Sequence, residues 1–130
     1  MKKTKWLNRS LITGPYMALC LSAQEYERAL AHCKIPRADR DPWMQSAQSD
    51  AQTHWLEHPK QGLVCIVTLR MKDGISGIQI ACLLLHEAVH IWRAFREHIG
   101  ETDPSREFEA YAIQAIAQTL MYEFSERIAT

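Results

Sequence analysis

The segment between Ser76 and Gly100 constrains the fold of this chain more than any other part of it. Ser76 and Gln79 have the spacing of a capping box, in which each side chain binds a free amide at the start of a helix. Gly100 is the residue type that most often ends a helix. The sequence therefore predicts one helix over residues 77–99. Apolar side chains occur on almost every side of its middle part, residues 80–92, so we expect this helix to be buried.

The strand candidates all lie before this helix. Leu63–Leu69 is apolar throughout and rich in β-branched residues, which is typical of a central strand. Residues 51–57 can extend, and the turn-forming residues 58–62 connect them to that strand as a hairpin. Residues 16–21 form a further apolar stretch, and a short helix is expected over residues 23–33. These segments predict a small, mainly antiparallel sheet.

A second long helix is predicted over residues 104–127, because Asp103-Pro104 combines an N-cap residue with a proline at the first helical position. The fold expected from these elements is α+β, with the sheet packed against two long C-terminal helices. A chain of 130 residues can bury one core but is short for two. Residues 1–130 are therefore expected to form a single domain.

Charge and composition exclude several classes of partner. Fifteen basic residues balance fifteen acidic ones, so nucleic acid and anionic membranes are not expected partners. No apolar run reaches the roughly 18 residues that span a bilayer, and residues 8–10 and Gly14-Pro15 interrupt a secretory signal. The cysteines show no CxxC pair, which favours reduced thiols and a cytoplasmic protein. They are Cys20, Cys33, Cys65 and Cys82.

The most informative segment is His86-Glu87-Ala88-Val89-His90, inside the first long helix. Histidines four residues apart share one face of a helix, so both imidazoles can bind one metal ion. Glu87 points about 100° away from His86 and is expected to lean over a metal-bound water. In metal-assisted hydrolysis the ion makes the water more acidic and a carboxylate accepts the proton. The segment predicts one Zn²⁺ ion held by His86 and His90, with Glu87 as the catalytic base.

Two histidines and a glutamate are costly to bury in an apolar helix unless a ligand or hydrogen bonds satisfy them. A metal ion would satisfy them. The alternative is a pair of core histidines bonded to carbonyl groups, with Glu87 exposed to solvent.

The second long helix offers two carboxylates as a third ligand. Glu109 begins an apolar stripe that must pack inward, whereas Glu107 begins a more polar face. Glu109 is therefore the predicted ligand and Glu107 the alternative. Cys82, one turn before His86, could also bind the ion, although packing as a small buried residue is the simpler role. His54 lies on a predicted strand and is expected at the surface.

At this point the chain resembles a known group. The HExxH segment, followed after eighteen residues by Glu109-Ala110-Tyr111-Ala112, resembles the gluzincin branch of zinc metallopeptidases. The Glu-Ala-Tyr-Ala run is similar to the glutamate helix of the ImmA/IrrE peptidases. Over nearly its full length the chain resembles small HExxH proteins of bacteriophages and prophages. They share its residues 6–10 and its Glu-Phe-Glu-Ala-Tyr-Ala-Ile-Gln stretch.

The resemblance implies a minimal zincin-like metallopeptidase that hydrolyses peptides or proteins in the cytoplasm of a bacterial host. In gluzincins two histidines and a later glutamate bind zinc, which corresponds here to His86, His90 and Glu109. Only a few residues follow the glutamate helix, so the second subdomain that closes the gluzincin cleft is not expected. The cleft would then be shallow, or a protein partner or a second copy would complete it. Two other functions remain open: a structural metal-binding domain without catalysis, and a phage-encoded regulatory protein with a vestigial HExxH.

Overall fold

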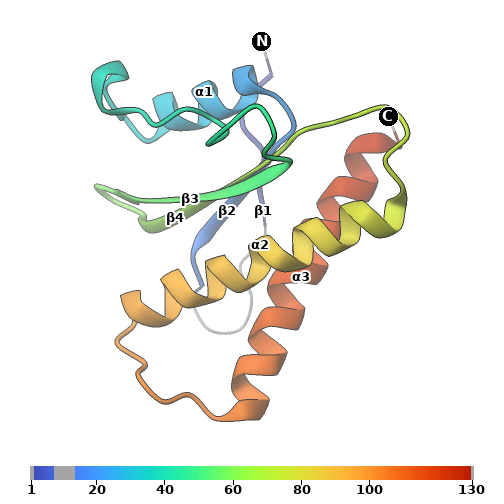
Figure 1. Cartoon of the computed structure of the whole chain (residues 1–130). Helices are drawn as coiled ribbons and strands as arrows, with labels where there is room; N and C mark the ends of the chain where they lie inside the picture. Colours follow the sequence, from blue (N-terminus) through green and yellow to red (C-terminus); the bar gives the residue numbers. More distant parts are fainter. Residues whose placement is uncertain (1, 8–13, 130) are drawn as a thin grey trace.

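The computed structural model describes residues 2–7 and 14–129 of the chain. Within these residues the chain forms four strands and three α-helices (Figure 1). Their bounds are β1 Trp6–Leu7, β2 Tyr16–Cys20, α1 Ala23–His32, the short 3-10 helix η1 Arg37–Asp39, β3 Ala51–His58, β4 Gly62–Leu69, α2 Gly77–His98 and α3 Arg106–Ile128. The predicted α+β class, with two long C-terminal helices, is confirmed.

The described strands form one sheet in the order β1-β2-β4-β3. β4 lies inside the sheet, antiparallel to β3 and parallel to β2, and every residue of β4 after Gly62 is buried. The predicted central strand is therefore confirmed. Two of the three pairings are antiparallel, as expected for a sheet built around a hairpin. The sequence did not predict β1, because two residues are too few to show a strand pattern.

The sheet separates two apolar cores. Successive residues of a strand face opposite sides, so Val64 and Ile66 of β4 contact α1, while Cys65 and Val67 face the long helices. Figure 1 shows α1 on one side of the sheet and α2 and α3 on the other. The continuous apolar run of β4 follows from this arrangement, because both faces of the strand are covered.

The helix ends show where local sequence signals decided the structure. Both hydrogen bonds of the capping box are present: the Gln79 amide donates to Ser76 Oγ, and the Ser76 amide donates to Gln79 Oε1. Gly100 has a φ of 74°, as expected for the residue that ends α2. The predicted start of the last helix at Pro104 is wrong. Ser105 caps α3 instead, because its Oγ accepts the amide of Phe108 at 3.1 Å.

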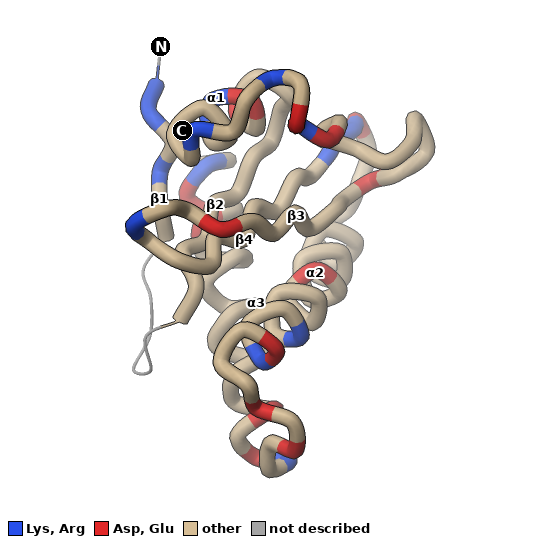
Figure 2. The backbone as a smooth tube through the Cα atoms, turned by 90° about the vertical axis from the view of Figure 1, so that its left-hand side faces the viewer, with Lys and Arg blue, Asp and Glu red and all other residues tan. Residues whose placement is uncertain are grey.

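Charges are mixed over the fold. Figure 2 shows basic and acidic positions close to one another near α1 and near the start of α3. Among the described residues, no helix combines the length and the apolar character required to cross a bilayer.

Candidate metal centre

His86 and His90 lie side by side on α2. Their Nε2 atoms are 3.2 Å apart, and their ring centroids are separated by 4.9 Å. The prediction that both imidazoles share one face of the helix is confirmed. Nitrogen ligands about 2.0–2.1 Å from a tetrahedral zinc ion lie roughly 3.3 Å from each other. The spacing of the two Nε2 atoms therefore fits two positions of one such ion.

The histidine pair faces solvent, contrary to the expectation of a helix that is buried all round. His86 and His90 are exposed, and so is Cys82 one turn earlier. The sheet and α3 cover only part of the circumference of α2, which leaves this face open. The two imidazoles therefore do not need a metal ion to offset a cost of burial, as the sequence had suggested. The expectation that Cys82 packs as a small buried residue is wrong.

Glu87 is the buried member of the segment. Its side chain is only 4% exposed and faces the sheet, where Thr53 Oγ1 of β3 lies 2.9 Å from Glu87 Oε1 as a hydrogen-bond donor. Thr53 is itself buried and also lies 3.3 Å from the Glu87 carbonyl oxygen. The alternative from sequence, with buried histidines and an exposed Glu87, is thus the reverse of the observed arrangement. The sequence did not single out Thr53, because a strand pattern does not show which helix residue it meets.

Glu109 lies in the first turn of α3 and points at α2, as its place in the apolar stripe predicted. Its Oε2 accepts a hydrogen bond from Trp92 Nε1 at 2.7 Å and lies 3.9 Å from Nη1 of Arg96. Trp92 and His90 are two residues apart on α2, so their side chains leave the helix about 160° from each other. The structure therefore brings Glu109 to the Trp92 side of α2.

No set of three His, Cys, Asp or Glu side chains within the described ranges is arranged to hold a metal ion. The structure thus assembles the two predicted histidine ligands but not the predicted third ligand beside them. The two alternative ligands considered from the sequence, Glu107 and Cys82, are both exposed.

His54 is buried, so its expected surface position is wrong. Its Nε2 lies 3.1 Å from the Trp43 carbonyl oxygen, and its Nδ1 lies 3.3 Å from the Tyr26 hydroxyl. Burial lowers the pKa of His54 below its ordinary value of 6.5, although the bond to the Trp43 carbonyl opposes this change. These two contacts show that His54 joins the segment before β3 and helix α1 to the sheet.

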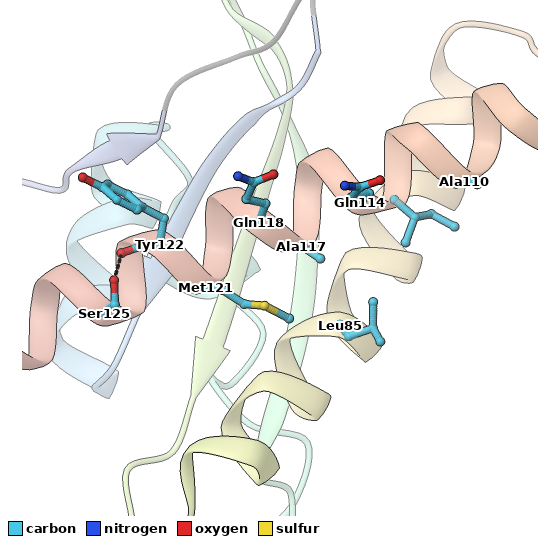
Figure 3. A pocket seen from close by; sticks show the side chains of 9 residues that line it. Leu85, Ala110, Gln114, Ala117, Gln118, Met121, Tyr122 and Ser125 are labelled. Carbon is cyan, nitrogen blue, oxygen red and sulfur yellow. Dashed lines mark hydrogen bonds between the residues drawn. The ribbon is translucent and has the colours of Figure 1, made fainter.

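An apolar groove of about 800 Å³ runs between α2 and α3. Leu85, the residue before His86, lines it from α2, and Ile113 and Met121 line it from α3. In Figure 3 the side chains of Leu85 and Met121 both point toward the space between the helices. Neither His86 nor His90 lines this groove; Leu85, one position before His86, is its lining residue on α2.

The arrangement brings together two imidazole nitrogens that could both bind one divalent ion. Two neutral imidazoles favour zinc and its neighbours among the transition metals. Comparisons of the chain with protein-family models, curated proteins and solved structures gave no match.

Proposed function

We propose that the protein is a zinc-dependent peptidase in which His86 and His90 hold the ion. The observation that carries the proposal is the 3.2 Å separation of the two Nε2 atoms on an accessible face of α2, with Glu87 next to one of them in sequence. Exposure of the pair supports binding from solution without rearrangement of the core. The third ligand in this proposal is Glu109, which would have to leave its hydrogen bond to Trp92 to reach the ion.

Each protein group has a distinct role in the proposed reaction. Zinc held by these residues would polarise the scissile carbonyl and make a bound water more acidic. Glu87 would accept a proton from the attacking water, and the hydrogen bond from Thr53 at 2.9 Å holds its carboxylate in place. The groove that starts at Leu85 receives apolar side chains of a peptide substrate.

The proposed setting is the cytoplasm of a bacterial host. Cys20, Cys33, Cys65 and Cys82 are all free thiols, which is consistent with a reducing compartment. A protein partner or second copy packed beside the exposed face of α2 would deepen the apolar groove between α2 and α3.

Metal binding without hydrolysis is the second candidate function. The observation that favours it is the burial of the proposed base: Glu87 is 4% exposed and bonded to Thr53 on the sheet side of α2, while the two histidines face solvent. The two functions differ in the E87Q variant when zinc-loaded protein is incubated with a quenched fluorescent peptide library. A peptidase loses cleavage in E87Q and keeps its zinc, whereas a binding module shows no cleavage in either protein.

A further inference from the structure

A polar cavity lies where the N-terminal segment, α1 and the end of α3 meet. Its volume is about 350 Å³, at the smaller end of the range of small-molecule sites. Figure 2 shows basic positions of all three elements on the side where the two chain ends are marked. We refer to this space as the terminal cavity. Its lining includes five cationic side chains and two carboxylates, which are Lys2, Lys3, Lys5, Arg28, Arg127, Glu25 and Glu126.

Two of the five cations hold the walls of the terminal cavity together. Lys5 Nζ lies 2.7 Å from Oε1 of the buried Glu123, which joins the N-terminal segment to α3. Arg127 Nη2 lies 2.6 Å from Glu25 Oε2, which joins α3 to α1. Because each of these cations already has a carboxylate partner, their charges are compensated within the fold.

The other three cations are not compensated in this way. In the part of the chain that the structure describes, no ion pair uses Lys2, Lys3 or Arg28. Arg28 Nη1 donates to the Lys2 carbonyl oxygen, but a guanidinium has five N–H donors. Glu126 is the remaining carboxylate of the lining. Three cations against one carboxylate leave an excess of two positive charges.

We propose that the terminal cavity binds a small phosphate-bearing molecule through Arg28, Lys2 and Lys3. A phosphate monoester carries a charge of about −1.5 to −2 near pH 7, which balances the excess, whereas a carboxylate carries only one charge. The guanidinium can bind two phosphate oxygens as a fork, and the ammonium groups attract the anion as point charges. The site is separate from the proposed metal centre, because α2 contributes no residue to its lining.

Titration of the ¹⁵N-labelled full-length chain with inorganic phosphate, and separately with glycerol 3-phosphate, tests this inference. Sodium chloride keeps the ionic strength constant, so that general screening does not change. We expect saturable shifts of the Arg28 Nε–H resonance and of the backbone amides of residues 3–5. R28Q should weaken binding at least about tenfold, because it removes a charged donor, and K3Q about twofold to fivefold, because it removes one exposed charge. R106Q is the matched control, since Arg106 is exposed at the opposite end of α3, and its affinity should equal that of the wild type.

Three results would overturn the phosphate site. The first is the absence of a saturable shift with either phosphate compound. The second is a loss of affinity in R106Q as large as that in R28Q, because binding would then follow net charge and not this cavity. The third is binding only to vesicles of phosphatidylcholine and phosphatidic acid, with no response to the soluble compounds. If R28Q does not fold, the comparison of K3Q with R106Q decides, because the Lys3 side chain is exposed and its removal leaves the core intact.

Discussion

Thr53 of β3 donates a hydrogen bond to the buried carboxylate of Glu87 on α2, with 2.9 Å between Oγ1 and Oε1. This bond joins the edge strand of the sheet to the helix that carries the histidine pair. A buried carboxylate without a hydrogen-bond donor destabilises the folded state, because nothing offsets the loss of its hydration. The contact therefore stabilises the fold and fixes the direction of the proposed catalytic base.

The T53V variant tests this bond. Valine keeps the shape of threonine but offers no donor to Glu87, so we expect the free energy of unfolding to fall by about 1–3 kcal/mol. Chemical denaturation followed by circular dichroism measures the change. T53S retains the hydroxyl and should lose clearly less stability than T53V; equal losses would show that the methyl packing, not the bond, is what matters.

The E87Q variant tests the proposed base. Glutamine can still accept the Thr53 hydroxyl through its carbonyl oxygen, so the fold should remain intact, but it cannot take a proton from water. We expect peptide cleavage by the zinc-loaded protein to fall at least about a hundredfold, with unchanged zinc content. Cleavage at the wild-type rate by E87Q would remove Glu87 from the mechanism.

The buried position of His54 predicts a pH-dependent stability. Its pKa is lower in the folded protein than in the unfolded chain, mainly because burial disfavours the charged ring. Below about pH 6.5 the unfolded chain therefore binds more protons, and the free energy of unfolding should fall as the pH decreases through this range. Urea denaturation at a series of pH values measures the slope.

The matched control for this slope is the half-exposed His98 at the end of α2. H54Q should flatten the dependence of stability on pH below about 6.5, whereas H98Q should leave the contribution of His54 in place. A profile that is unchanged in H54Q would assign the effect to other groups.

Two leucines on the long helices should respond very differently to truncation. Leu120 of α3 is fully buried in the core shared with α2 and the sheet, whereas Leu85 of α2 is 45% exposed beside the groove. We expect L120A to lower the free energy of unfolding by about 2–5 kcal/mol, because it leaves a cavity, and L85A by less than about 1 kcal/mol. Similar losses in both variants would contradict the packing of α3 against α2.

The sequence predicted those features that local patterns determine. The apolar run of β4, the capping box at Ser76 and the glycine that ends α2 each specify their own element, and the structure has these elements at the expected places. The start of α3 was misplaced because Pro104 and Ser105 are both acceptable helix-start residues, and the hydrogen bond to Phe108 decided between them.

Features that depend on tertiary contacts were harder to predict. Helical spacing placed His86 and His90 on one face, but only the packing of α2 shows that this face is open to solvent while Glu87 faces β3. The partners of Glu109 and His54 likewise come from other elements of the fold. No periodicity within a single helix or strand carries that information.

Zinc content is the most direct test of a metal centre at His86 and His90. After incubation with zinc and removal of unbound metal, elemental analysis of the full-length wild-type protein should find about one ion per chain. The same analysis should find almost none in H86A or H90A, and unchanged content in H98Q. Wild-type protein that retains no zinc, or an H86A variant that retains as much as the wild type, would contradict a metal centre at His86 and His90.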